Sequence, residues 1–401
     1  MKKIILMVMI LTFLVSCQSE KQTSFEDYSD WDQVLQEGQG QTVTILMWGG
    51  NESINQYMDG YVSDHLKEMY DITLNRVPMN APEYLNKLLN EKKSGVEIGT
   101  ADLLWINAEN FKTAKQGGLL SGPFTHLLPN LNTYYDQNAS DLSYDSGIAI
   151  EGYEGIWGRA QLVFTGDDLK IKSYAELLDY AKSHPGRITY PRIPDDFVGV
   201  AFFRNAYYEL TGETDIFQTD MTRDEFEILS QSVIDYFKDL HTYMWNQGQV
   251  LPASQAQLDE LFRNGEVDMT MGFEIGKTAG LVASGVYDES VKPFVFETGT
   301  IGNSHYLAVP YNSPEKAGAL LVIDFLESPP AQVEKMKSDV WGDMPAFDTS
   351  KVDDHVLEAL NQIESKPGSL TLETLTEHRN PEMKAIYVEW IKEIWIEEFA
   401  Q

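Results

Sequence analysis

Two hydrophobic patterns alternate along the chain. Short runs of consecutive apolar residues predict buried strands, and stretches in which apolar residues recur every three or four positions predict amphipathic helices. In the N-terminal part we expect strands over residues 42–48, 71–77 and 101–106, and helices over residues 51–70, 82–93 and 109–116. Strands that alternate with helices of this length are typical of parallel βαβ units.

The alternation continues through the middle of the chain. We expect helices over residues 173–183, 197–210, 226–245 and 255–263, and strands over residues 187–190, 267–271 and 291–296. Extended stretches at 157–164 and 300–310 are expected to cross between two lobes. The chain ends in helices over residues 314–326, 331–336 and 383–399. The last helix has an acidic polar face, which favours docking onto a lobe over membrane binding.

The N-terminus has the pattern of an export signal. Lys2 and Lys3 precede an apolar run over residues 4–15, which is shorter than the roughly 20 residues of a membrane-spanning helix. The segment Leu14-Val15-Ser16-Cys17 resembles the bacterial lipoprotein signal, in which the cysteine is acylated and becomes the first mature residue. We therefore expect a protein outside the cytoplasm, lipid-anchored to a bacterial membrane and facing the periplasm or the cell surface. An ordinary signal peptide with a chance cysteine is the alternative.

About 360 residues are too many for one ordinary hydrophobic core, so we expect two lobes. Together with the N-terminal signal, this divides the chain into five segments. We expect a lipoprotein signal peptide at 1–16, a tether at 17–40, the first part of lobe 1 at 41–158, lobe 2 at 159–298, and a return to lobe 1 with C-terminal helices at 299–401.

Charge and reactive residues exclude several function classes. The formal net charge of −32 argues against a nucleic-acid partner. Cys17 is the sole cysteine, so its acylation would leave no thiol for a disulfide, a metal site or a nucleophile. The seven histidines form no HExxH or HxH pair, no GxSxG occurs, and the segment 272–278 lacks the spacing of a phosphate-binding loop. We expect no enzyme, no catalytic residues, no metal site and no cofactor.

Several strings, in order along the chain, resemble one family. They are Trp48-Gly49-Gly50, Trp105-Ile106-Asn107, Gly122-Pro123-Phe124, Trp157-Gly158, Ala160-Gln161-Leu162-Val163-Phe164, His184-Pro185-Gly186-Arg187, Gly299-Thr300-Ile301-Gly302-Asn303-Ser304-His305 and Val340-Trp341-Gly342-Asp343. Over about residues 44 to 345, the chain resembles the YnjB-type solute-binding proteins of ABC importers.

The resemblance implies a type II periplasmic-binding-protein fold. In that fold two α/β lobes, with mixed sheets flanked by helices, are joined by two crossover strands that act as a hinge, and a solute is held in the cleft between the lobes. The implied partners are a small solute, an ABC permease and its ATPase, and the expected state is a monomer.

Ligands of open α/β sheets lie beyond the carboxyl ends of the strands, and this rule selects candidate binding residues. The candidates are Trp48, Gly49, Gly50, Asn51, Trp105, Asn107, Glu109, Asn110, Trp157, Arg159, Gln161, Tyr190, Asp195, Asp196, Phe197, Phe273, Glu274, Asn303 and Trp341. Structural roles compete with binding at some of them, since Trp48 could pack over a turn and Asn107 or Asp196 could cap a helix.

Aromatic and acidic candidates outnumber basic ones, because Arg159 and Arg192 are the only cations near these loops. Aromatic faces and carboxylates together suit an organic cation. The sequence therefore favours a cationic or zwitterionic nitrogenous solute. Alternatives are an anion such as a phosphonate or sulfate, a metal ion, or a role as a ligand-sensing lipoprotein that signals to a membrane receptor.

Overall fold

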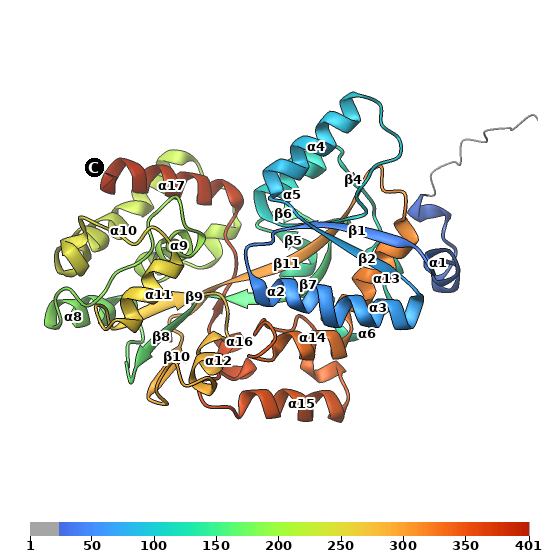
Figure 1. Ribbon diagram of the computed structural model, residues 1–401. Coiled ribbons are helices and arrows are strands. Elements are labelled where there is room, and N and C mark those ends of the chain that lie inside the picture. The colour runs from blue at the N-terminus through green and yellow to red at the C-terminus, as the bar shows by residue number, and fades with distance from the viewer. Residues whose placement is uncertain (1–23, 401) are drawn as a thin grey trace, which may run out of the picture.

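A computed structural model describes residues 24–400, which form two α/β lobes lying side by side (Figure 1). The expected signal peptide and Cys17 lie outside the described residues. Within residues 24–400, no helix combines the length and the apolar character needed to cross a bilayer.

The first lobe is built on a mixed seven-stranded sheet of order β12-β11-β3-β1-β2, with β4 and β7 also paired to β11. Its strands are β1 (Thr42–Met47), β2 (Thr73–Pro78), β3 (Leu103–Ile106), β4 (Leu120–Ser121), β7 (Gly155–Gln161), β11 (Thr300–Pro310) and β12 (Arg379–Asn380). The pairs β1–β2 and β1–β3 are parallel, as the βαβ pattern predicts, whereas β11 runs antiparallel to β3 and β7.

The first lobe also contains helices. They are α1 (Trp31–Gly38), α2 (Glu52–Gln56), α3 (Ser63–Tyr70), α4 (Ala81–Lys93), α5 (Ala108–Gln116), α6 (Pro129–Tyr134), α13 (Lys316–Glu327), α14 (Pro329–Met336), α15 (Asp354–Glu364) and α16 (Leu372–Glu377). A π-helical turn, η2 (Tyr57–Val62), joins α2 to α3, so the helix expected over 51–70 is not uniform. A short hairpin of β5 (Tyr144–Asp145) and β6 (Ile148–Ala149) follows α7 (Ser140–Ser143).

The second lobe has a smaller antiparallel sheet of order β10-β8-β9. Its strands are β8 (Val163–Asp167), β9 (Met269–Gly272) and β10 (Val291–Phe294), and its helices are α8 (Tyr174–Ser183), α9 (Phe197–Thr211), α10 (Arg223–Tyr243), α11 (Gln255–Arg263) and α12 (Lys277–Ala283). The strand expected over residues 187–190 does not form. This segment makes isolated backbone hydrogen bonds, such as Trp245 N to Ile188 O and Asp268 N to Arg187 O, and it pairs with no strand in a ladder.

The two expected crossovers are present. β7 belongs to the first sheet and leads through Leu162 directly into β8 of the second, and β11 returns the chain to the first sheet. The two meet as an antiparallel pair in which Asn303 lies opposite Ala160.

Both ends of the described chain differ from expectation. Residues 24–40, expected as part of a tether, instead fold onto the first lobe, because Phe25, Tyr28 and Val34 are apolar and become buried in its core. The C-terminal helix α17 (Ala385–Phe399), expected on lobe 1, instead packs on α9 and α10 of the second lobe, where Tyr387, Ile391 and others join the core (Figure 1).

Candidate functional site

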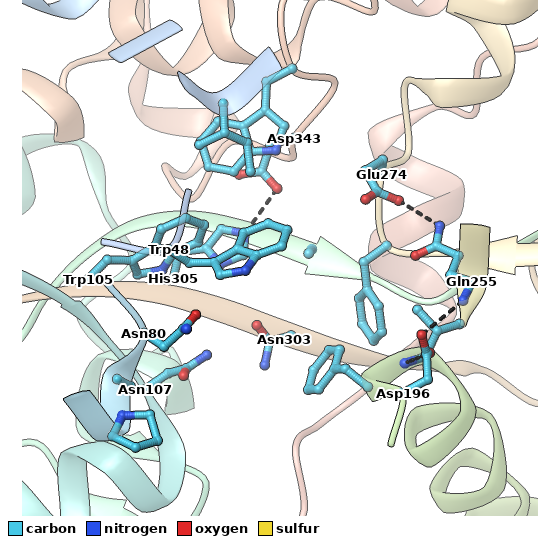
Figure 2. A pocket seen from close by; sticks show the side chains of 18 of the residues that line it. Trp48, Asn80, Trp105, Asn107, Asp196, Gln255, Glu274, Asn303, His305 and Asp343 are labelled. Atoms are coloured by element: carbon cyan, nitrogen blue, oxygen red, sulfur yellow. Dashed lines mark hydrogen bonds and ion pairs between the residues drawn. The ribbon is translucent and has the colours of Figure 1, made fainter. Parts of the chain in front are cut away.

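A cavity of about 560 Å³ lies between the two lobes (Figure 2). Its volume falls in the range of about 300–1,000 Å³ that is usual for small-molecule sites. Side chains of both lobes and both crossovers line it: Trp48, Ile54, Asn80, Ala81, Pro82, Tyr84, Trp105, Asn107, Ala160, Asp196, Phe197, Val198, Gln255, Phe273, Glu274, Asn303, His305, Trp341 and Asp343.

The first-lobe wall is aromatic. The Trp105 ring packs edge-on against His305, with centroids 5.2 Å apart, and His305 stacks on Trp341 at 5.6 Å. Trp157 lies fully buried behind them, 5.3 Å from both Trp105 and Trp341. Trp48 stands at the end of β1 with 48% of its surface exposed, which leaves an apolar face free for contact.

The second-lobe wall combines two phenylalanines with two carboxylates. The rings of Phe197 and Phe273 lie 5.0 Å apart. Asp196 caps α9, because one carboxylate oxygen accepts from the backbone N–H groups of Val198 and Gly199, and the other accepts from Gln255 N at the start of α11. Glu274 accepts one bond, from the Gln255 side chain at 3.1 Å (Figure 2).

The crossovers form the floor. On β11, Asn303 and His305 are two positions apart and both line the cavity, as expected for side chains on one face of a strand. Opposite them, β7 contributes the small side chain of Ala160. The floor therefore consists of the Asn303 amide, the His305 imidazole and the space left by the small side chain of Ala160.

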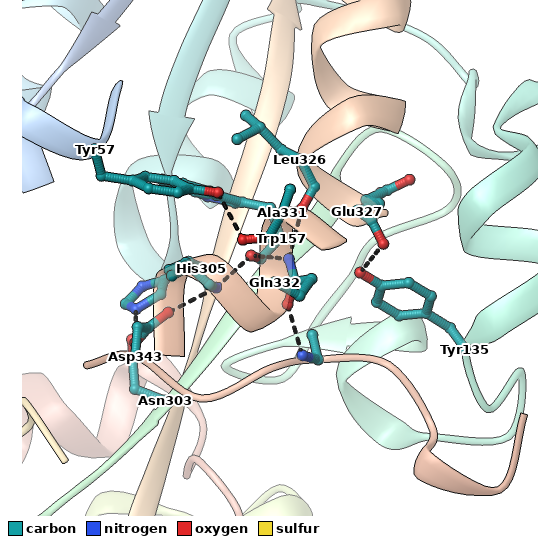
Figure 3. A network of polar contacts seen from close by, with 12 residues as sticks. Tyr57, Tyr135, Trp157, Asn303, His305, Leu326, Glu327, Ala331, Gln332 and Asp343 are labelled. Atoms are coloured by element: carbon teal, nitrogen blue, oxygen red, sulfur yellow. Dashed lines mark hydrogen bonds and ion pairs between the residues drawn. The ribbon is translucent and has the colours of Figure 1, made fainter. Parts of the chain in front are cut away.

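A buried ion pair supports the aromatic wall (Figure 3). Lys335 Nζ donates to Asp343 at 2.8 Å and to the backbone oxygen of Trp157 at 2.6 Å, and it lies over the rings of Trp157 and Trp341. Asp343 also bonds His305 Nε2 at 3.2 Å. Burial alone would raise the pKa of the Asp343 carboxyl, but Lys335 and His305 outweigh burial and lower it. Burial lowers the pKa of Lys335, and Asp343 opposes that effect.

The charges that reach the cavity are mostly negative. Three carboxylates line it, from Asp196, Glu274 and Asp343, and Asp343 is neutralised by Lys335 behind the wall. In the part of the chain that the structure describes, no lysine or arginine lines this cavity. Nor do residues 24–400 gather three or more His, Cys, Asp or Glu side chains in an arrangement that could hold a metal ion.

Nine of the candidates from the sequence are brought together in this cavity. They are Trp48, Trp105, Asn107, Asp196, Phe197, Phe273, Glu274, Asn303 and Trp341. They come from segments spread over about 290 positions, so the rule that ligands lie beyond strand ends selects a real cluster. The expectation that Asp196 caps a helix holds as well, since it does so while lining the cavity.

Three candidates on β7 do not line the cavity, and for Arg159 and Gln161 the reason is that side chains alternate along a strand. Ala160 faces the cavity, whereas Arg159 pairs with Asp141 at 2.7 Å and Gln161 bonds Thr300 and the backbone oxygen of His378. Trp157 is fully buried behind the aromatic wall.

The other candidates outside the cavity have structural roles or lie on neighbouring turns. Gly49 packs against Pro78, the ring of Trp48 lies over Gly50, and Asn51 caps α2. Asp195 pairs with Arg192, and the buried Tyr190 hydroxyl contacts His241 and Trp395. Glu109 and Asn110 lie in the first turn of α5 and do not line the cavity.

Sequence reasoning missed ten lining residues, and some had a usable signal. Asn80 follows β2, so the strand-end rule applied to it as well as to Asn107. His305 lies two positions after Asn303 on the same expected strand, so both side chains fall on one face. Asp343 belongs to the same family-like segment, Val340-Trp341-Gly342-Asp343, as Trp341. Ile54, Ala81, Pro82, Tyr84, Ala160, Val198 and Gln255 carried no such signal, because apolar or common polar residues at element ends are ordinary packing positions.

Comparison with known proteins identifies the family. Residues 61–361, which include both crossovers and most of both lobes, match the family described as "Bacterial extracellular solute-binding protein". The chain belongs to this family. It is also 34% identical over 338 residues to Protein YnjB of Escherichia coli strain K12, a match that covers 83% of this chain and 86% of YnjB. The resemblance drawn from the sequence strings is thus confirmed.

Solved structures show the same fold. An ABC transporter protein from Clostridium perfringens matches with a TM-score of 0.63 at 15% identity, over 89% of this chain and 98% of that one. The cyclic alpha-maltosyl-1,6-maltose binding protein from Arthrobacter globiformis matches with a TM-score of 0.62 at 15% identity, over 89% of this chain and 94% of that one. The expected two-lobed fold is therefore confirmed.

Membership of the extracellular solute-binding family settles the broad role. The protein is a solute-binding protein and not an enzyme, it works outside the cytoplasm, and its partner is a small-molecule solute. The interlobe cavity is the candidate site for that small molecule.

Proposed function

We propose that this solute-binding protein captures a cationic or zwitterionic nitrogenous solute in the interlobe cavity and delivers it to an ABC permease. The observation that carries the proposal is the lining of the cavity, where aromatic faces and carboxylates meet with no lysine or arginine among the described lining residues. Aromatic faces attract organic cations, and desolvation strengthens the attraction. An anion would need basic groups or free backbone N–H groups, and Arg159 and Arg192 both lie outside the lining and are paired with aspartates.

Glu274 is the carboxylate best placed to meet a cation. Both carboxylate oxygens of Asp196 already accept hydrogen bonds from backbone N–H groups, three in all, and Asp343 is paired with Lys335. Glu274 accepts a single bond, from Gln255, and therefore keeps acceptor capacity for a ligand. A solute that bridges Glu274 on the second lobe and the tryptophans on the first would favour closure of the lobes by its tighter binding to the closed form.

The proposal is tested by following the melting temperature of the purified protein against a panel of organic ammonium compounds, organic anions and divalent metal ions. We expect saturable stabilisation by at least one ammonium compound. Glu274→Gln should weaken that binding by about tenfold or more, because a hydrogen bond to a charged group is worth about 1.5–3 kcal/mol.

The matched control is Glu213→Gln, which removes an exposed carboxylate of the same lobe and should leave affinity unchanged. Tight binding of an anion or a metal ion with no response to any ammonium compound would overturn the cationic assignment.

We also propose that Cys17 carries the lipid anchor that holds the protein at the membrane beside its permease, and that the protein acts as a monomer. The lipoprotein-like segment Leu14-Val15-Ser16-Cys17 and the absence of any other cysteine in the sequence support the anchor.

A further inference from the structure

The chain makes a third connection between the lobes. After α16, residues 378–384 run from the first lobe to α17 on the second. This segment lies along the crossover β11, because β12 pairs with it in parallel, with Thr300 opposite Arg379. Its first residue, His378, accepts bonds through its backbone oxygen from Thr300 N and from the Gln161 side chain. The connection is thus tied to both crossovers.

Glu382 on this third connection touches the floor of the cavity from outside. Its Oε1 accepts a bond from Asn303 Nδ2 at 2.8 Å. Its Oε2 accepts from Arg204 of α9 at 2.9 Å, and the Arg204 side chain is only 4% exposed. The Arg204 guanidinium in turn lies 5.9 Å from the ring centre of Phe197, which lines the cavity. Glu382 is therefore held in place while it holds Asn303.

This contact fixes which end of the Asn303 amide faces the cavity. An ionised carboxylate can only accept hydrogen bonds, so Asn303 must turn its NH₂ group toward Glu382. Its oxygen is left on the other side, toward the cavity, where no group in the described chain donates to it (Figure 2). At Asn303 the floor of the cavity consequently offers a hydrogen-bond acceptor and not a donor.

An acceptor at this position distinguishes two kinds of organic cation. Aromatic faces attract quaternary ammonium groups and N–H ammonium groups alike. A quaternary ammonium has no N–H, so it would cover the Asn303 oxygen and leave that acceptor unpaired. Sites built to hydrogen-bond a ligand group reject analogues that lack the group, because the polar partner in the site is then left without a bond.

We propose that Glu382 is a positioning residue which, by orienting Asn303, selects solutes whose charged nitrogen carries N–H donors over quaternary ammonium solutes. This inference rests on the proposed function, because it refines the class of cation that the same cavity takes. Glu382 does not touch the solute itself. It acts by orienting Asn303, and it determines which class of ammonium solute binds more tightly.

The test compares two probes of similar shape, benzylammonium and benzyltrimethylammonium, with benzoate as the anionic probe, in titration calorimetry on the purified protein. The wild type should prefer benzylammonium by about tenfold or more. In Glu382→Gln the new amide can donate as well as accept, so Asn303 is free to turn over, and the preference should fall to within about threefold.

Two further variants keep the test decisive. Glu393→Gln removes a carboxylate of α17 that pairs with Arg223 at the surface, and it should keep the wild-type preference. If Glu382→Gln does not fold, Asn303→Leu removes the acceptor itself and should abolish the preference in the same way.

The outcomes separate this inference from the proposed function. Equal or tighter binding of benzyltrimethylammonium to the wild type, or an unchanged preference in both Glu382→Gln and Asn303→Leu, overturns the role of Glu382 and leaves the cationic assignment standing. Binding of benzoate alone, or of none of the three probes, counts against both.

Discussion

At the scale of single residues, Lys335 is the group on which the aromatic wall depends. It is fully buried, donates to Asp343 and to the backbone of Trp157, and lies 5.3 Å from the ring centre of Trp341. Gly158 makes room for it, since a side chain there would collide with Lys335 and Asp343. A buried ion pair is weak evidence of stabilisation, but breaking one leaves an uncompensated charge in a low-dielectric interior.

We therefore expect Lys335→Met to be strongly destabilising, by about 3–5 kcal/mol in the free energy of unfolding. The loss should be smaller in the double variant Lys335→Met/Asp343→Asn, because the second change removes the carboxylate that the first leaves unpaired. Chemical denaturation followed by circular dichroism measures both values. A single variant as stable as wild type, or a double variant less stable than the single one, would contradict this account of the pair.

At the scale of elements, the lobes also touch directly beside the cavity. Gly276, just before α12, donates its backbone N–H to Gly342 O at 3.1 Å, and Ile275 is buried in the core of the first lobe. A Cβ on Gly276 would meet the Cα of Gly342 at 2.6 Å, so only glycine allows the two backbones to approach this closely. The contact joins the segment that carries Glu274 to the segment that carries Trp341.

Gly276→Ala should push these two segments apart, at a cost of about 1–3 kcal/mol in stability. We expect it also to weaken the best ammonium ligand found in the melting-temperature panel, because Glu274 and Trp341 would no longer hold their spacing. The control is Gly60→Ala, since a Cβ at Gly60 meets nothing within 4 Å. Fluorescence titration measures the affinities. Equal affinity of the two variants would show that the glycine contact does not position the cleft.

The same scale shows what the sequence could predict. Apolar runs such as residues 42–47 located both sheets, and the strand-end rule located about half of the residues that line the cavity. Both succeed because burial and βαβ topology produce patterns in the local sequence. The face of β7 was not predictable, since Trp157, Arg159 and Gln161 look as suitable as Ala160 until the pairing with β11 fixes which face is which. The lobe that receives α17 was also hidden, because an apolar helix face fits either core.

At the scale of the whole molecule, the net charge of the protein and the lining of the cavity both favour a cationic solute. The chain carries 62 acidic and 30 basic residues, which gives the protein a strongly negative field. Such a field speeds the approach of cations and slows that of anions, and salt weakens both effects. The field does not determine affinity, which depends on groups such as Glu274 and Asn303 inside the cavity. It does make a cationic solute kinetically favoured before any contact forms.

The folded region also sets how far the lobes can stand from the membrane. Phe25 and Tyr28 are buried in the first core, so an anchor at Cys17 would be joined to Phe25 by a tether of only the seven residues 18–24. A chain spans at most about 3.5 Å per residue, so this tether reaches roughly 25 Å, far less than a tether extending to residue 40 would. Acylation at Cys17 would therefore hold the first lobe close to the bilayer surface and so to a permease.

Cys17→Ser should accordingly abolish lipid attachment without changing the fold, because residue 17 lies ahead of Phe25, the first buried side chain among the described residues. We expect the variant to incorporate no radiolabelled palmitate when expressed in a bacterial host and to leave the membrane fraction, while its purified form melts at the wild-type temperature. Ser19→Ala is the matched control, since it alters the same segment and keeps the cysteine. Palmitate label retained in Cys17→Ser would refute the anchor, and loss of label in both variants would place the requirement in the surrounding segment instead of the thiol.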